Sequence, residues 1–211
     1  DEWYRSLFSG CRGISGDVTP SYSVLDEEDV LRMHQAVPDA KLIFLIRDPV
    51  ERAWSMLRFH EQFGKPLDMN NLEGFKERID DPTQDRRSDY LRTIDLFQRF
   101  YPRDQILVGF FDAIREDPAG LLRSVCRYVG ADEGLIADES LAKAFNKSRR
   151  QDSCPPEFRD YLKHKYRPMV AALAERFGGY PGRWLDGWDG KEADVDGCPA
   201  PVVWADGQPF P

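Results

Sequence analysis

Residues 41–46 are a run of mostly apolar side chains, and Arg47, Asp48 and Pro49 follow it directly. The run has the length of a strand and no polar alternation, which is typical of a strand covered on both faces in a parallel sheet. Asp48 is suited to cap a helix, and Pro49 suits the first helical position, where no N–H is needed. The stretch therefore predicts a buried strand whose carboxyl end leads directly into a helix that stops near Gly64.

A second buried strand is predicted over residues 105–111, after a helix-patterned segment over residues 88–101. Strand, helix and strand in this order favour a parallel pair, because a crossover returns the chain in the same direction. We therefore predict an α/β fold with a central parallel sheet flanked by helices.

The rest of the chain adds helices and a tail to this centre. Residues 1–188 are expected to form one domain and residues 189–211 an irregular tail rich in Gly, Pro and Asp. Pro168 is placed to kink or split the last of the predicted helices. These helices cover residues 26–36, 116–130 and 157–177.

Composition excludes some classes of partner. The chain has 211 residues and a net charge of −8, which argues against a general nucleic-acid binder, because affinity for phosphate backbones needs clustered Lys and Arg. No run approaches the roughly 20 apolar residues of a membrane-spanning helix, and no signal peptide is recognisable. Nucleic acid and a membrane span are therefore not expected, and the oligomeric state is left open.

The four cysteines, Cys11, Cys126, Cys154 and Cys198, are scattered, without a CxxC pair or a partnered histidine spacing. This pattern does not predict a zinc site, and we expect no metal. Free thiols of this kind are typical of a reducing compartment, so the predicted location is the cytoplasm.

Arg47 is the first candidate for a functional residue, because ligands of open α/β sheets bind at the carboxyl ends of strands. A guanidinium there, beside a helix N-terminus, offers a planar fork for phosphate oxygens, and the hydroxyl of Ser55 could donate to the same anion. Arg47 as a plain surface salt bridge at a helix start is the competing interpretation. Glu51 and Arg52 are expected to pair on the surface.

Several motifs, in the same order as in the family, resemble those of the sulfotransferases that use 3′-phosphoadenosine-5′-phosphosulfate, especially their bacterial and heparan-sulfate-type branch. They are "GDVTPSY", "KLIFLIRDPVERAWS", "FYPRDQILVGFFDAIREDPAGLLRSVCRYVG" and "NKSRR", within a resemblance that runs from Trp3 to Trp184. The resemblance implies a three-layer fold like that of P-loop nucleoside triphosphatases. It also implies transfer of a sulfuryl group from this donor to a hydroxyl or an amine of a small-molecule or carbohydrate acceptor.

The resemblance assigns roles at the nucleotide. Arg47 and Ser55 match the family's pair on the 3′-phosphate, and Phe111 falls where an aromatic often lies near the adenine, although a core strand residue is an equal alternative. Lys147, Ser148 and Arg149 match a basic loop of the family that closes over the 3′-phosphate. The alternative is that these residues are simply a basic run exposed to solvent.

The resemblance also indicates which residues lie near the acceptor. Asp17, Thr19 and Tyr22 match a segment that runs past the acceptor pocket, with plain turn chemistry at Thr19 as the alternative. Val18 stands where heparan-type enzymes carry Lys, which argues against a polysaccharide acceptor.

Family members begin with a strand and a glycine-rich, Lys-containing loop that cradles the 5′-phosphosulfate, followed by a catalytic base. The sequence contains no such string, so no catalytic residue is assigned. We favour the interpretation that the sequence is part of a longer sulfotransferase, because loss of the first strand would expose a sheet edge. The alternatives are a non-catalytic module that binds a nucleotide or sulfate through the 3′-phosphate half-site, and a kinase of related fold.

Overall fold

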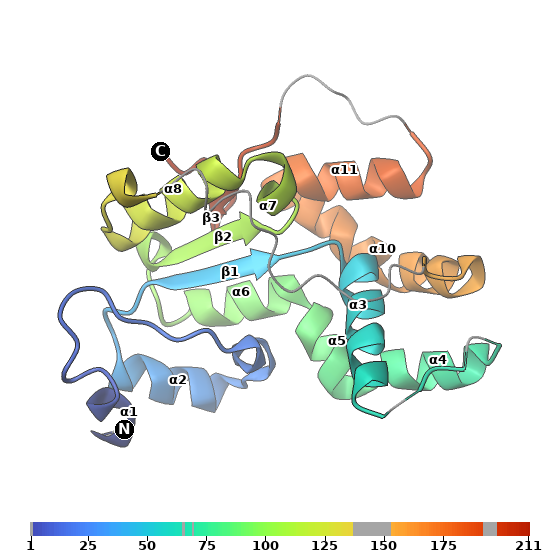
Figure 1. Cartoon of the computed structure of the whole chain (residues 1–211), viewed down its shortest axis with the longest axis horizontal. Helices are drawn as coiled ribbons and strands as arrows, with labels where there is room; N and C mark the ends of the chain where they lie inside the picture. Colours follow the sequence, from blue (N-terminus) through green and yellow to red (C-terminus); the bar gives the residue numbers. More distant parts are fainter. Residues whose placement is uncertain (1, 65, 69, 137–152, 192–197) are drawn as a thin grey trace.

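The computed structural model describes residues 2–64, 66–68, 70–136, 153–191 and 198–211 (Figure 1). A three-stranded sheet lies at its centre, in the order β1 (Leu42–Ile46), β2 (Ile106–Phe110), β3 (Val202–Trp204). β1 and β2 are parallel, with Ile46 opposite Phe110 at their carboxyl ends, and β3 is antiparallel to β2. The predicted strand, helical crossover and parallel strand are confirmed.

Helices lie on both sides of the parallel pair (Figure 1). On one side lies α8 (Pro118–Val129), and on the other lies α6 (Tyr90–Gln98), whose Phe97 packs against Phe44 of β1 with ring centroids 5.2 Å apart. This arrangement confirms the predicted α/β class. Further described elements are α1 (Glu2–Ser6), the 3-10 helix η1 (Pro20–Val24), α2 (Glu27–Ala36), η2 (Arg103–Gln105), α7 (Ala113–Glu116) and η3 (Glu133–Leu135).

The two parallel strands differ in their burial. Every residue of β2 is buried, as predicted, whereas Ile43 and Leu45 of β1 are 39% and 48% exposed. The prediction that β1 is covered on both faces was therefore wrong for one face. The reason is position, because β1 lies at the edge of the described sheet and β2 at its centre.

The helix after β1 begins as the sequence predicts. α3 (Pro49–Gln62) has Asp48 as its N-cap and Pro49 at its first position. Two short helices then follow where the sequence is polar, α4 (Leu72–Ile79) and α5 (Pro82–Ser88).

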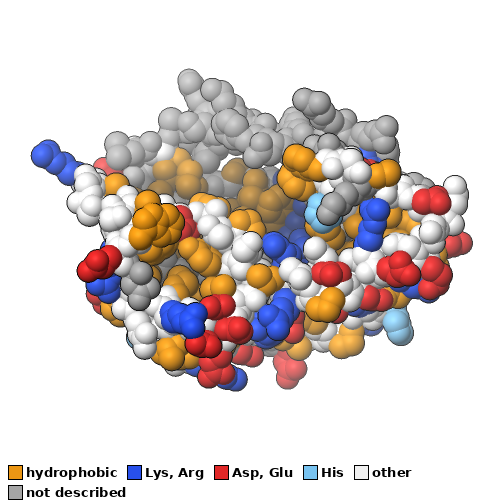
Figure 2. Space-filling model, turned by 90° about the horizontal axis from the view of Figure 1, so that it is seen from below, with side chains coloured by type: hydrophobic (Ala, Val, Ile, Leu, Met, Phe, Trp, Pro, Cys, Tyr) orange, Lys and Arg blue, Asp and Glu red, His pale blue; other side chains and the backbone are white. Residues whose placement is uncertain are grey.

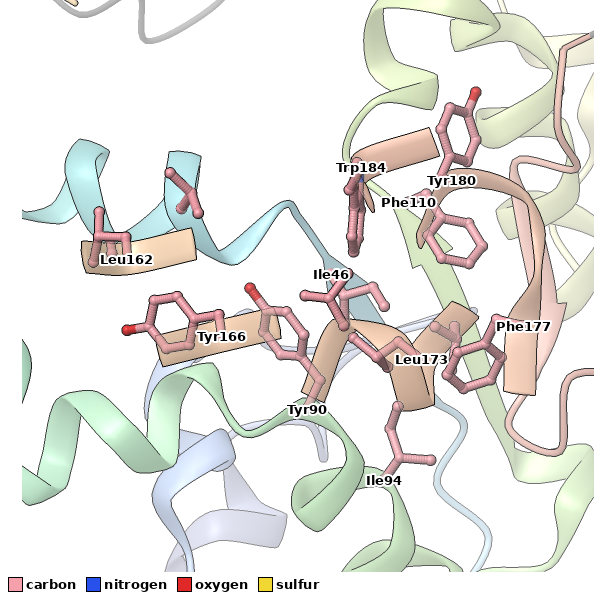
Figure 3. Close-up of a cluster of buried hydrophobic side chains, with 14 of the residues drawn as sticks. Ile46, Tyr90, Ile94, Phe110, Leu162, Tyr166, Leu173, Phe177, Tyr180 and Trp184 are labelled. Atoms are coloured by element: carbon pink, nitrogen blue, oxygen red, sulfur yellow. The ribbon is translucent and has the colours of Figure 1, made fainter. Parts of the chain in front are cut away.

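The longest helix, α10 (Pro156–Phe177), continues across Pro168 and is not split. It is followed by α11 (Gly179–Trp188), which the sequence analysis does not predict because the segment is rich in Gly and Pro. The main core gathers where these two helices meet α6 and the carboxyl ends of β1 and β2 (Figure 3). The buried side chains labelled in Figure 3 are those of Ile46, Tyr90, Ile94, Phe110, Leu162, Tyr166, Leu173, Phe177, Tyr180 and Trp184.

The segment expected to be an irregular tail contains a strand. Val202 and Val203 of β3 are buried, as is Ala205, and β3 extends the sheet beyond β2. The sequence pattern hides this strand because only three residues pair. The expectation of an irregular tail was therefore wrong here, and the domain boundary at residue 188 stays a prediction.

One face of the molecule is drawn in Figure 2, and its described part has a mixed charge. Acidic and basic side chains are interspersed over the face in Figure 2, and no continuous basic stripe crosses its described part. Within the described residues, no helix is both long enough and apolar enough to span a bilayer. The exclusion of nucleic acid, inferred from charge, stays a prediction.

Candidate functional site

Arg47 lies at the carboxyl end of β1, where the paired strands bring it beside Phe111. Because Ile46 and Phe110 are opposite each other in register, the residues that follow them are neighbours, and the N–H of Phe111 donates to the carbonyl of Ile46 over 2.8 Å. The guanidinium carbon of Arg47 lies 4.7 Å from the centroid of the Phe111 ring. The ring therefore supports the guanidinium in a cation–π contact.

The backbone at Arg47 is also held in place. The hydroxyl of Tyr90, in α6, donates to the carbonyl of Arg47 over 2.9 Å. Burial raises the pKa of Tyr90 to about 12, so this hydroxyl keeps its proton and remains a donor at neutral pH. Backbone and side chain of Arg47 are thus positioned by two different elements.

Glu51 is the ion-pair partner of Arg47, and it has a second partner. Its carboxylate lies 3.8 Å from the guanidinium of Arg47 and 3.0 Å from that of Arg159 in α10. The expected surface pair of Glu51 and Arg52 is not formed, because Arg52 instead donates to the buried hydroxyl of Ser88. The sequence analysis missed Arg159, and no local pattern marks it.

Ser55 is exposed on α3, one helical turn beyond Glu51. Residues four apart lie on the same face of a helix, so Ser55 shares the face on which Glu51 contacts Arg47. Ser55 and the Glu51 that contacts Arg47 therefore lie on one face of α3, and a shared anion at Arg47 and Ser55 stays a prediction.

Asp48 occupies the N-terminus of α3, where the sequence analysis expects free N–H groups to attract an anion. Its carboxylate accepts from the N–H groups of Val50 and Glu51, and from the indole N–H of Trp188 over 2.9 Å. Burial raises its pKa, although these hydrogen bonds act in the opposite direction. An anion at this site must therefore bind chiefly to side chains.

Asp112, after β2, also accepts from an indole, although its side chain does not cap α7. The indole N–H of Trp184 donates to its carboxylate over 3.2 Å. Burial raises the pKa of Asp112, while this hydrogen bond and, less strongly, Arg47 act in the opposite direction. Trp184 and Trp188 are one turn apart on α11, so this helix covers the carboxyl ends of both parallel strands. Their spacing in the sequence was a signal for a helix that the neighbouring Gly and Pro residues masked.

Two of the predicted acceptor residues, Asp17 and Tyr22, form a cluster with Tyr4. The hydroxyls of Tyr4 and Tyr22 both donate to the carboxylate of Asp17, over 3.0 and 2.8 Å. Burial raises the pKa of Tyr22, and its bonds to Tyr4 and Asp17 act in the same direction. Thr19 is exposed and precedes η1 without making a side-chain cap. No described hydrogen bond, ion pair or ring contact joins this cluster to Arg47.

The remaining predicted residues, Lys147, Ser148 and Arg149, lie outside the described residues. The cysteines are free thiols, and burial raises the pKa of Cys154, which precedes α10, to about 11. The described chain holds no group of three or more His, Cys, Asp or Glu side chains suited to a metal ion.

An open cavity of about 420 Å³ lies where the start of α4 meets the start of α10. One of its lining residues, Phe158, directly precedes Arg159, so the cavity opens at the turn of α10 that carries this arginine. It is lined by Asn70, Leu72, Pro155, Pro156, Glu157 and Phe158.

Comparison with known proteins decides the family. The model of the sulfotransferase family matches residues 17–133, which include Arg47, Ser55 and Phe111. The chain belongs to the sulfotransferase family.

Curated relatives of this sulfotransferase chain include mouse heparan sulfate glucosamine 3-O-sulfotransferase 3B1, which is 32% identical over 148 residues. That match covers 65% of this chain and 36% of the relative. Human heparan sulfate glucosamine 3-O-sulfotransferase 6 is 30% identical over 138 residues, or 61% and 39% of the two chains. The chain thus spans little more than a third of the length of these relatives.

A solved structure has the same fold. The crystal structure of a sulfotransferase from Alicyclobacillus acidocaldarius superposes with a TM-score of 0.60 at 21% identity, over 92% of this chain and 73% of the other. The predicted α/β fold of sulfotransferases is thereby confirmed.

Proposed function

We propose that this sulfotransferase chain binds 3′-phosphoadenosine-5′-phosphosulfate and takes part in the transfer of its sulfuryl group to a hydroxyl or an amine. The observation that carries the proposal is the position of Arg47. Its guanidinium lies at the carboxyl end of a parallel strand, is supported by Phe111, and is only loosely paired with Glu51 at 3.8 Å. A guanidinium has five N–H donors, so Arg47 keeps donors for a phosphate.

In this proposal Arg47 and Ser55 bind the 3′-phosphate of the nucleotide. Arg47 contacts Glu51, which lies on the same face of α3 as Ser55, and this supports the pairing. The contact with Phe111 orients the planar guanidinium toward which two phosphate oxygens would bind. Phe111 then contributes by positioning Arg47 and, through the rest of its ring, by contact with the adenine. Lys147, Ser148 and Arg149 are proposed to close over the same phosphate.

The donor, when bound, supplies the activated sulfuryl group. The described residues would anchor the end of the nucleotide remote from that group. Anchoring a remote phosphate fixes the orientation of the reacting end, which is how remote binding energy lowers a barrier. No residue is assigned to the base or to the sulfuryl group itself.

The acceptor is proposed to be a carbohydrate or a small molecule that approaches Asp17, Thr19 and Tyr22. The names of the curated relatives, which act on heparan sulfate glucosamine, support a sugar. Val18, in place of a lysine, favours an acceptor less anionic than heparan sulfate. The free cysteines support a cytoplasmic location as part of the same proposal.

The test is a calorimetric titration of the chain with 3′-phosphoadenosine 5′-phosphate, with adenosine 5′-monophosphate as the control. We expect the first nucleotide to bind more tightly, because only it carries the phosphate that Arg47 and Ser55 would hold. Equal affinities for the two nucleotides would refute the assignment. The alternative of a non-catalytic module is not favoured by the family match.

A further inference from the structure

One carboxylate lies between two guanidinium groups at this site. Oε2 of Glu51 lies 3.8 Å from Nη2 of Arg47, and Oε1 lies 3.0 Å from Nη2 of Arg159. The three side chains are between 26% and 37% exposed, so the cluster is open to a ligand from solvent. Two cations share one anion, so these three side chains together carry one net positive charge, while Asp48 and Asp112 interact with Glu51 and Arg47, respectively, from the strand ends.

The two arginines come from different parts of the fold and converge only here. Arg47 follows β1, while Arg159 lies in the first turns of α10, which packs against α3. Without the carboxylate between them, the two guanidiniums would repel each other. Glu51 therefore keeps both in place while no other anion is bound.

A carboxylate and a phosphate present oxygens of similar spacing to a guanidinium fork, so one can replace the other between the same two arginines. Glu51 can give way without unfolding the helix, because it is tethered to α3 by a flexible, partly exposed side chain. The position of its carboxylate thus marks a place that suits an anion.

We propose that Glu51 is a resident counter-ion that the 3′-phosphate of the nucleotide displaces, and that Arg159 is a second phosphate-binding guanidinium beside Arg47. This inference rests on the function proposed above. It has two consequences for affinity. Glu51 lowers the affinity for the nucleotide, because its ion pairs must be broken first, and Arg159 raises it.

The experiment uses the full 211-residue chain and calorimetric titration with 3′-phosphoadenosine 5′-phosphate and adenosine 5′-monophosphate. Glu51→Gln should bind the first nucleotide about two- to fivefold more tightly than the wild type, the range for partly exposed ion pairs. Arg159→Gln should bind it about three- to tenfold more weakly. Binding of adenosine 5′-monophosphate should change in neither variant.

Matched controls come from the ion pair of Arg127 and Glu133, with atoms 2.9 Å apart. This pair lies near the start of β1, because the neighbouring Tyr128 donates to the carbonyl of Leu42, whereas Arg47 lies beyond its other end. Glu133→Gln and Arg127→Gln change the net charge by the same amounts as the test variants. Both should leave nucleotide affinity at the wild-type level.

The outcomes separate the two proposals. If the wild type prefers the 3′-phosphate but Glu51→Gln binds no more tightly than Glu133→Gln, or Arg159→Gln no more weakly than Arg127→Gln, the inference is overturned and the proposed function stands. If the folded wild type shows no such preference, both are overturned. Glu51→Asp provides a second variant, because its shorter side chain cannot reach both guanidiniums and should give an intermediate increase in affinity.

Discussion

The guanidinium of Arg47 lies 4.7 Å from the ring centroid of Phe111, although the two residues belong to segments far apart in the sequence. The register of the parallel strands brings them together, because Ile46 and Phe110, which precede them, are paired. The sequence analysis left open whether Phe111 lies in the core or near an adenine. In the structure its ring contacts the guanidinium of Arg47.

Phe111→Ala should weaken the binding of 3′-phosphoadenosine 5′-phosphate by about 0.5–1 kcal/mol, the range for an exposed cation–π contact. The loss arises because, without the ring, the guanidinium is no longer held in place and must be ordered when the phosphate binds. Phe111→Tyr keeps the ring and should bind like the wild type. Calorimetric titration of the two variants tests this, and unchanged affinity in Phe111→Ala would show that the ring does not position Arg47.

Arg47→Ala should weaken binding of the same nucleotide by about 1.5–3 kcal/mol, the range for a hydrogen bond to a charged group. Arg47→Lys keeps the charge but lacks the planar fork, so it should recover only part of the loss. Titration with adenosine 5′-monophosphate should give nearly equal affinities for all three proteins. An equal loss for both nucleotides would remove the 3′-phosphate assignment.

Trp188→Phe should destabilise the protein more at neutral than at acid pH. The indole N–H of Trp188 donates to the carboxylate of Asp48 and lowers its pKa, against the burial that raises it above the ordinary 3.8. The hydrogen bond favours the ionised form, so its contribution is present above the pKa of Asp48 in the folded protein and is lost as the pH falls through it.

The packing lost with the indole does not depend on pH, so it serves as an internal control. Urea unfolding between about pH 3 and about pH 7 should show the difference in the free energy of unfolding between wild type and variant growing with pH. At neutral pH we expect a hydrogen-bond contribution of about 1.5–3 kcal/mol. If the free energies of unfolding of wild type and variant differ by the same amount at acid and at neutral pH, the indole does not stabilise the ionised carboxylate of Asp48.

Gly207→Ala should destabilise the protein by more than about 2 kcal/mol. Gly207 has a φ of 86°, and an added Cβ would lie 1.9 Å from the carbonyl oxygen of Arg176, so strain and a backbone clash add together. Gly190→Ala is the matched control, because its φ is 70° but an added Cβ would meet no atom within 4 Å. It should cost only about 1 kcal/mol. Equal free energies of unfolding for the two variants would show that the segment after β3 is not packed as described.

Local chemistry determined much of the fold. The apolar runs that became β1 and β2, and the Asp48-Pro49 start of α3, were read from the sequence because strand length, capping and a missing N–H are properties of neighbouring residues. Gly130, with a φ of 84°, ends α8 for the same kind of reason. Arg47 was singled out because the end of a strand and the start of a helix adjoin in the sequence.

The tertiary structure decided the elements whose stability comes from distant partners. The Gly- and Pro-containing α11 is helical because Tyr180, Trp184 and Trp188 are buried in the core, and this burial outweighs a poor local propensity. β3 exists as a strand because β2 offers it hydrogen bonds.

The partners at the site were decided in the same way. No pattern of neighbouring residues shows that Glu51 pairs with Arg159 instead of Arg52, or that Asp48 accepts from Trp188. Each of these contacts joins segments more than a hundred residues apart, with 108 between Glu51 and Arg159 and 140 between Asp48 and Trp188. The sequence alone marked Arg47 as a candidate for binding an anion, and the packing of α10 and α11 against the strand ends decided which side chains meet there, because side-chain contacts depend on the whole folded core.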